Sequence, residues 1–236
     1  GWHSIFLALA LFGAVTGLAV YLHLPESRSA ATAAQAAGES ALASYLAALH
    51  NRQVSGFVLA GALNGAALLA YVAGSPALFI RHFGVPPSAF GWIFALNALG
   101  LVLSTQLNRR LLLHFPPATM ARNGSVFAFL FAAVLALLAL TGMAGMAATI
   151  ALLFLGLGSY GFVSANSSAL ALGAMPERAG AVSALIGAGA FAFGAVASTL
   201  TAPFASNGPT AMTVAMAVAF LGSAAAIRRA VGRPLR

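Results

Sequence analysis

Between Arg122 and Glu177 the chain runs for 54 residues without a charged side chain. A second run, 179–227, contains 49 uncharged residues. Since a helix needs roughly 20 apolar residues to cross a hydrocarbon core of about 30 Å, each run is long enough for two crossings. Each run also contains helix-breaking residues, at Gly142 and Gly145 in the first and at Pro203 and Pro209 in the second. The sequence therefore predicts an all-α integral membrane fold.

The composition excludes other broad classes of protein. Of the 236 residues, 61% are apolar and 6% are charged, whereas a soluble domain carries about 25% charged residues. A water-soluble enzyme and a disordered chain are both excluded. The chain has no cysteine and only three acidic residues, and no histidine pair has the spacing of metal ligands. We therefore expect neither a metal site nor a cofactor.

Reading between the charges gives seven candidate membrane spans. Most of their boundaries carry glycine or proline, as expected where a helix ends near the membrane surface. The spans are 5–22, 54–75, 88–106, 124–140, 147–170, 180–201 and 210–227.

The arginines predict the orientation of these spans. The first, third and fifth loops and the C-terminus contain ten of the eleven arginines: Arg28, Arg52, Arg109, Arg110, Arg122, Arg178, Arg228, Arg229, Arg233 and Arg236. The other loops contain only Arg81. Because cytoplasmic loops carry the excess of arginine, the C-terminus is expected in the cytoplasm and residue 1 outside, in a cell inner (plasma) membrane. The net charge of +8 is thus a topology signal and a contact with membrane lipid, and no nucleic-acid partner is expected.

The predicted organisation has four parts. Residues 1–24 form a membrane helix, 25–53 a cytoplasmic linker, 54–228 a six-helix bundle and 229–236 a cytoplasmic tail. Within the linker, Leu42, Tyr45, Leu46 and Leu49 share one helical face, and the preceding Glu39 and Ser40 provide an acid and an N-cap. This pattern predicts an interfacial helix, with a flexible alanine-rich linker as the alternative. An outside N-terminus without a starting methionine or a basic leader indicates that upstream sequence is missing.

Two short motifs are better explained by helix packing than by chemistry. Gly156, Gly158 and Gly161 match the dinucleotide pattern G-x-G-x-x-G, but they fall inside a membrane span and not between a strand and a helix. Small residues at this spacing allow helices to approach closely. Ser159 lies among these glycines, but every histidine lies at or beyond a span end. A serine–histidine hydrolase is therefore not expected.

Polar and aromatic side chains within four spans are the candidate binding groups. They align on helical faces, as in the set Asn64, Tyr71, Ser75 and the set Phe90, Phe94, Asn97, Ser104, Asn108. The fifth span offers Tyr160, Ser164 and Ser167, and the sixth offers Phe191, Ser198 and Thr201. Such groups either line a shared small-molecule cavity or hydrogen-bond between helices. No span contains a charge, so this segment lacks a proton-coupling residue of its own.

Several stretches together resemble the Bcr/CflA drug-resistance transporters of the major facilitator superfamily. They are GWHSIF (1–6), LPE (24–26), YVAGSP (71–76), FG (83–84), FGWIFALNALG (90–100), LNRR (107–110) and AGAVSALIG (179–187). The resemblance implies that the seven spans correspond to the sixth through twelfth helices of a twelve-helix transporter. It also implies that the first five helices, with the acidic residue expected to carry protons, lie outside this chain.

The resemblance implies a function for the candidate residues. Asn64, Tyr71, Asn97, Tyr160 and Phe191 are expected to line the C-terminal wall of a drug cavity. Arg109, Arg110 and Arg122 look like the second-half copy of the superfamily's gating-loop motif, although a plain positive-inside role explains them equally well. The expected function is efflux of small drug-like molecules such as antibiotics, by proton antiport in the full-length protein, with the missing N-terminal half as partner. The alternatives are a seven-helix receptor and a permease subunit that works with a partner chain.

Overall fold

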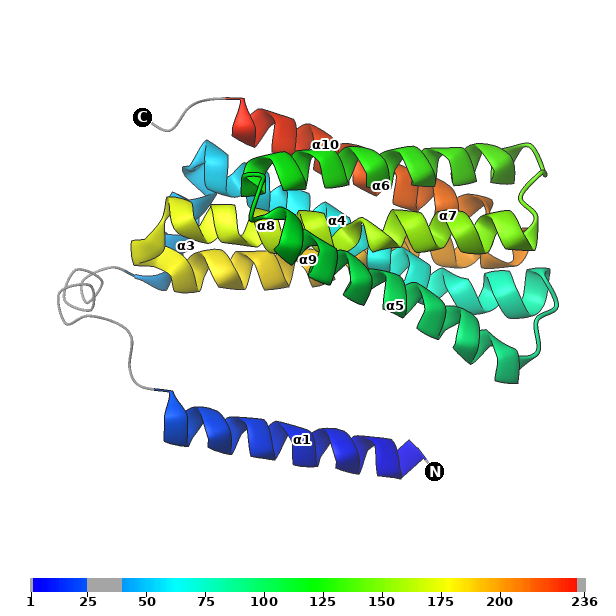
Figure 1. The fold of residues 1–236 in the computed structure, drawn as a ribbon, viewed down its shortest axis with the longest axis horizontal. Helices are drawn as coiled ribbons and strands as arrows, with labels where there is room; N and C mark the ends of the chain where they lie inside the picture. Colours follow the sequence, from blue (N-terminus) through cyan, green and yellow to red (C-terminus); the bar gives the residue numbers. More distant parts are fainter. Residues whose placement is uncertain (1, 25–39, 233–236) are drawn as a thin grey trace. The chain divides into compact units, whose positions relative to one another are not determined.

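The computed structural model describes residues 2–24 and 40–232 (Figure 1). The chain forms two compact units, Gly1–Glu39 and Ser40–Arg236. The first contains α1 (Trp2–His23), a helix of 22 residues. Its length and apolar composition are sufficient to cross a membrane.

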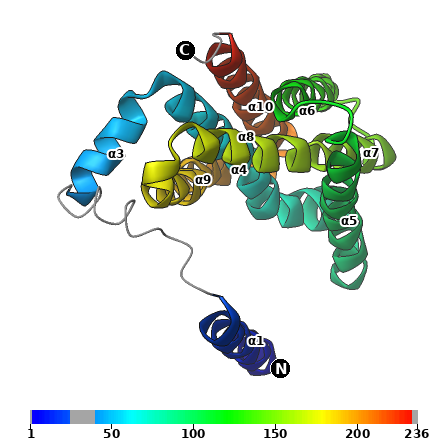
Figure 2. The ribbon, with the colours of Figure 1, turned by 60° about the vertical axis from the view of Figure 1, so that its left-hand side comes forward.

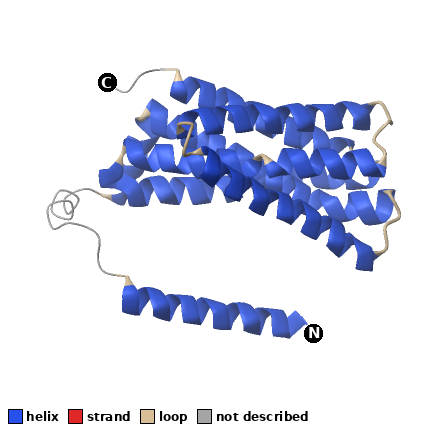
Figure 3. Ribbon diagram, in the orientation of Figure 1, coloured by secondary structure: helices blue, strands red, loops and turns tan. Residues whose placement is uncertain are grey.

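The second unit is built of helices, and no strand occurs in the described part of the chain (Figure 3). Its α-helices are α3 (Ala41–His50), α4 (Arg52–Pro76), α5 (Pro87–Leu111), α6 (Pro117–Leu140), α7 (Met146–Gly158), α8 (Tyr160–Ala174), α9 (Ala179–Thr201) and α10 (Thr210–Val231). Three short segments extend or join them: the π-helical η1 (Ala77–His82) and the 3-10 helices η2 (Pro176–Arg178) and η3 (Ala202–Asn207).

Seven helical segments in the described residues are long and apolar enough to cross a membrane, which confirms the predicted number and order of spans. One predicted span, 147–170, is divided in the structure at Ser159, where α7 ends and α8 begins. The Ser159 hydroxyl donates a hydrogen bond to the Leu155 carbonyl oxygen at 3.0 Å. Back-bonding of this kind accompanies bends in helices.

Helix α4 is the centre of the second unit. It packs against α8, α9 and α10, and α6 packs against α7, α8 and α10 (Figures 1 and 2). Small residues make close packing possible: a Cβ atom added to Gly65 of α4 would lie 2.8 Å from the Cβ of Ala190 in α9. Because lipid is as apolar as the helix surface, such close backbone approach supplies much of the association between membrane helices.

Seven of the eight arginines in the described part of the second unit gather at one end of the bundle. Antiparallel packing brings the start of α4, the α5–α6 turn, the α8–α9 connection and the end of α10 to this end, on the left in Figure 1. We call it the basic end; it carries Arg52, Arg109, Arg110, Arg122, Arg178, Arg228 and Arg229, whereas Arg81 lies at the other end. The expectation that Arg109, Arg110 and Arg122 lie on a loop was wrong. The first two belong to the last turn of α5 and Arg122 to α6, because these helices continue past their apolar segments.

Helix α3 lies within the predicted linker, of which residues 25–39, including Glu39, fall outside the described part. Ser40 caps it as expected, since its hydroxyl oxygen accepts a hydrogen bond from the Ala43 amide at 3.2 Å. Ala48 is buried against the bundle, whereas Leu42, Leu46 and Leu49 are exposed. The helix therefore has one packed face and one unpartnered apolar face.

Candidate functional site

The five residues predicted to line a binding wall occupy three different environments. Asn64 and Tyr71 of α4 and Asn97 of α5 are fully buried inside the second unit. Tyr160, the first residue of α8, is partly exposed, and Phe191 of α9 is 73% exposed. Three of the five side chains are thus buried inside the bundle, and the other two lie at its surface. Their contact with a substrate remains a prediction.

Tyr71 and Asn97 lie together between α4 and α5. The Tyr71 ring stacks on Phe94 at a centroid distance of 5.7 Å, and the side chains of Asn97 and Ser75 lie beside its hydroxyl. The Asn97 amide group donates to the Ile93 carbonyl oxygen of its own helix at 3.0 Å. The Tyr71 hydroxyl, Ser75 Oγ and Asn97 Oδ1 complete no hydrogen bond within the described residues. These three polar atoms therefore lack hydrogen bonds in a region where burying such atoms costs free energy.

Asn64 connects α4 to the start of α8. Its side-chain amide donates a hydrogen bond to the Tyr160 carbonyl oxygen at 3.3 Å. That carbonyl lies just past the break at Ser159, where the helix is interrupted. Asn64 thus helps to hold the backbone from which the Tyr160 side chain projects.

Tyr160 lines a hollow of about 380 Å³ between α5 and α8, which we call the polar hollow. Its polar side chains come from Thr105 and Gln106 on α5 and from Tyr160 and Ser164 on α8. The rest of the lining consists of Leu101, Val102, Gly161 and Ala165. A mixed lining of this kind, with a few neutral hydrogen-bonding groups, suits an uncharged or weakly polar small molecule.

Gly161 allows the two walls of the polar hollow to meet. A Cβ atom at this position would lie 2.5 Å from Ser104 Oγ and 2.8 Å from Thr105 Oγ1. The third glycine of the G-x-G-x-x-G match therefore serves helix packing, in agreement with the interpretation from sequence.

Sequence reasoning missed Thr105, Gln106 and Asn166. Thr105 and Gln106 fall within one turn of Arg109, where polar residues are ordinary at a span end. Asn166 of α8 is buried and donates a hydrogen bond to Asn108 Oδ1 of α5 at 2.8 Å. The available signal was a neutral amide inside a predicted span, which in lipid must find a partner.

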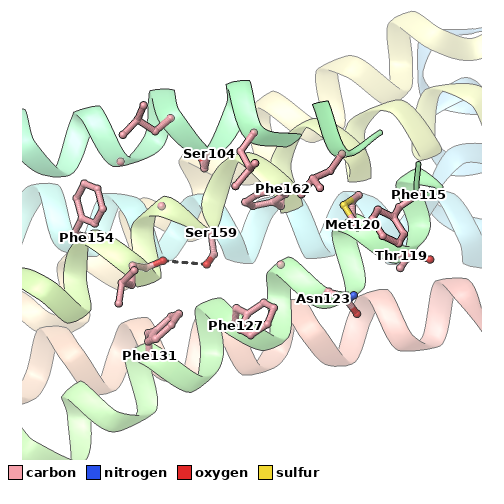
Figure 4. Close-up of a pocket in the computed structure, with 17 residues that line it drawn as sticks. Ser104, Phe115, Thr119, Met120, Asn123, Phe127, Phe131, Phe154, Ser159 and Phe162 are labelled. Atoms are coloured by element: carbon pink, nitrogen blue, oxygen red, sulfur yellow. Dashed lines mark hydrogen bonds between the residues drawn. The ribbon is translucent and has the colours of Figure 1, made fainter. Parts of the chain in front are cut away.

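A second and larger cavity lies between α5, α6 and the α7–α8 segment (Figure 4). This cavity of about 570 Å³, which we call the apolar crevice, is lined by five phenylalanines: Phe115, Phe127, Phe131, Phe154 and Phe162. Thr119 and Asn123 lie at the end near the α5–α6 turn, and Phe131 and Phe154 at the other (Figure 4). Several lining side chains, such as Phe127 and Leu107, are half-exposed on the surface of the bundle.

Neither cavity has a carboxylate, histidine, lysine, arginine or cysteine among its lining residues. The two linings supply shape, apolar surface and neutral hydrogen-bonding groups.

Comparison with known proteins agrees with the fold. The chain matches the Major Facilitator Superfamily over residues 1–199. It is 27% identical over 201 residues to a bicyclomycin resistance protein homolog of Haemophilus influenzae, covering 85% of this chain and 50% of that protein. It is 26% identical over 200 residues to an uncharacterized MFS-type transporter, YdgK, of Bacillus subtilis, covering 84% and 49%.

No solved structure matches the chain. The chain spans about half the length of the two relatives. The family match covers most of the chain, and seven helices in the described residues are long and apolar enough to span a membrane. The chain is therefore a multi-pass membrane protein. The chain belongs to the Major Facilitator Superfamily, whose members are transporters and not enzymes.

Proposed function

We propose that this chain supplies the C-terminal part of a transporter that exports small drug-like molecules, with the polar hollow on the substrate path. The polar hollow carries the proposal, because it places Thr105, Gln106, Tyr160 and Ser164 around an open volume of about 380 Å³. The resemblance to a bicyclomycin resistance protein homolog supports antibiotics as the substrate class. Family membership argues against the seven-helix receptor.

The five predicted wall residues take different parts in this proposal. Tyr160 and Phe191 present their side chains at the bundle surface and contact substrate directly. Asn64, Tyr71 and Asn97 support the wall from behind, since Asn64 holds the Tyr160 backbone and Tyr71 stacks on Phe94 of α5. Substitution of the buried three changes the wall through helix position and not through lost substrate contacts.

The partner in this proposal is the other half of the transporter. Helices α5 and α9 are the least buried spans of the second unit, and α9 exposes Phe191, Val196 and Leu200. Transport by two rocking halves about a midplane site needs such a second half. A continuous upstream reading frame with five further spans supports a single-chain transporter, and its absence supports a permease subunit with a separate partner chain.

The basic end is proposed to face the cytoplasm. It carries seven of the eight arginines within residues 40–232, and positive charge accumulates on the inner side of membrane proteins. Proton antiport is part of the proposal, with the coupling group outside this chain. Glu177 is the only acidic residue in the described part of the chain, and it lies in η2, which joins α8 to α9.

Drug export by the whole protein is the direct test. Cells of a drug-sensitive bacterial strain that express the full-length protein are expected to tolerate more bicyclomycin than cells with an empty vector. A protonophore is expected to abolish export measured in energised vesicles. Unchanged tolerance across a panel of antibiotics at normal membrane expression would contradict the proposed function. Export that persists without a proton gradient would contradict the antiport mechanism alone.

A further inference from the structure

The apolar crevice runs lengthwise between the helices of the bundle. On α5 its lining extends from Gly100 to Leu111, and on α6 from Thr119 to Phe131. At 1.5 Å per residue these stretches are about 17 and 18 Å long. Half of a hydrocarbon core of about 30 Å is roughly 15 Å. The crevice therefore extends from the basic end of the bundle over about the depth of one membrane leaflet.

The lining of the crevice changes with depth. Its interior side chains are phenylalanines and leucines, including Leu103, Leu107 and Phe127, which are each about half-exposed. Polar side chains occur within the crevice at Ser104 and Ser159, but both hydroxyls donate to carbonyl oxygens of their own helices. The deep part of the crevice thus offers apolar contact and almost no free hydrogen-bonding capacity.

The mouth of the crevice at the α5–α6 turn has the opposite character. Thr119 and Asn123 line it, and Arg110 follows Leu103 by seven residues, which places both on one face of α5. Arg109, Arg122 and His114 occupy the neighbouring turns and are exposed. No acidic residue occurs in the crevice lining or in residues 87–140, so these cations have no nearby anionic partner on α5, α6 or their turn.

We propose that the apolar crevice is a binding site for an anionic phospholipid of the leaflet at the basic end. One acyl chain lies along Leu103, Leu107 and the phenylalanines, and the phosphate lies at the turn beside Arg110. The site joins an apolar groove of one-leaflet depth to a cationic mouth, and this combination matches the two parts of a lipid. Each arginine near a membrane surface strengthens attraction to anionic lipid, and guanidinium groups bind phosphate in a bidentate manner.

The site is separate from the proposed substrate path. The polar hollow is lined by Thr105, Gln106 and α8 residues such as Ser164, whereas the apolar crevice is lined by the face of α5 that contains Leu103, Leu107 and Leu111. Lipid in the crevice contacts α5, α6 and α8 together. Its binding is therefore expected to stabilise the packing of these three helices, whether or not the protein exports a given drug.

The test uses purified, delipidated full-length protein in detergent. Dioleoyl phosphatidylglycerol and dioleoyl phosphatidylcholine have the same acyl chains and differ in headgroup charge. Each lipid is titrated into the protein. Native mass spectrometry counts the bound lipids, and thermal unfolding gives the unfolding temperature. Phosphatidylglycerol is expected to bind more tightly and to raise the unfolding temperature. Arg110→Gln is expected to weaken its binding by about fivefold, whereas Arg229→Gln, an exposed arginine at the same end in α10, leaves binding unchanged.

A second pair of variants tests the groove itself. Leu107→Trp fills the crevice and is expected to remove phosphatidylglycerol binding. Leu99→Trp, at an equally exposed position on α5 outside the crevice, retains it. Equal binding of the two lipids, or identical affinities for Arg110→Gln and Arg229→Gln, would overturn the proposal. So would unchanged binding in Leu107→Trp, or a stabilisation produced by an exported drug and by neither lipid.

Discussion

Asn166 of α8 donates a side-chain hydrogen bond to Asn108 Oδ1 of α5, with 2.8 Å between donor and acceptor. Both side chains are buried, and the same Asn166 amide group also bonds the Phe162 carbonyl oxygen at 2.7 Å. The pair lies between the polar hollow and the arginines that end α5. It links the two helices that form the hollow, and the burial of both side chains keeps water from replacing a lost partner.

Asn166→Ala is expected to destabilise the protein by about 0.6 kcal/mol, and by up to about 1.7 kcal/mol, the range of interhelical hydrogen bonds in membrane proteins. The reason is that Asn108 Oδ1 loses its partner while it stays buried. Thermal or denaturant unfolding in detergent measures the effect. Ser167→Ala is the matched control, since Ser167 is the next residue and its buried hydroxyl has no hydrogen-bond partner among the residues that the structure describes. Equal loss of stability in both variants would show that the amide pair contributes nothing.

Gly161→Ala is expected to destabilise the protein by about 1–3 kcal/mol, as overpacking does elsewhere. The added methyl group would meet Ser104 Oγ and Thr105 Oγ1 and would push α8 away from α5. Gly173→Ala, in the same helix with no atom within 4 Å of the new Cβ, is expected to be neutral or to gain up to about 1 kcal/mol. The same unfolding assay compares the two, and a destabilised Gly173→Ala beside a neutral Gly161→Ala would contradict the packing described between α5 and α8.

Single cysteines test the orientation proposed for the bundle. The chain has no cysteine of its own, so His114→Cys in the α5–α6 turn and Met143→Cys in the α6–α7 turn each report one site. Both positions are exposed. In intact cells a membrane-impermeant maleimide is expected to label Met143→Cys, and to label His114→Cys only after permeabilisation. The reverse pattern would place the basic end outside and contradict the proposed topology.

The membrane spans were predictable because their signal is local and strong. Long uncharged runs such as 123–176 must form helices in lipid, and Ser40 had the residue type and position of an N-cap. The ends of α5 and α6 were less accessible to sequence reasoning. Arg109 and Arg122 interrupt the apolar pattern, but the backbone hydrogen bonds of a helix can continue past the hydrocarbon core. Hydropathy therefore predicts which residues lie in the membrane and not where the helix ends.

The site was only partly predictable for a different reason. Helical periodicity shows that Tyr71 and Asn97 lie on the polar faces of their spans, but it does not show what each face packs against. In the structure these two residues meet each other inside the bundle, whereas Tyr160 lines an open hollow just after the break at Ser159. No residue pattern specifies that a break occurs at this serine. Thr105 and Gln106 join Tyr160 only through the crossing of α5 and α8.

Drug export by variants of the full-length protein tests whether the polar hollow contacts the exported molecule. Tyr160→Ala and Gln106→Ala are expected to change the relative resistance to different antibiotics by severalfold at normal membrane expression. Leu137→Ala, at an exposed position of α6 outside both cavities, is expected to keep the parent profile. If the two hollow variants keep a resistance profile identical to that of the parent and of Leu137→Ala, the polar hollow does not contact the exported molecule.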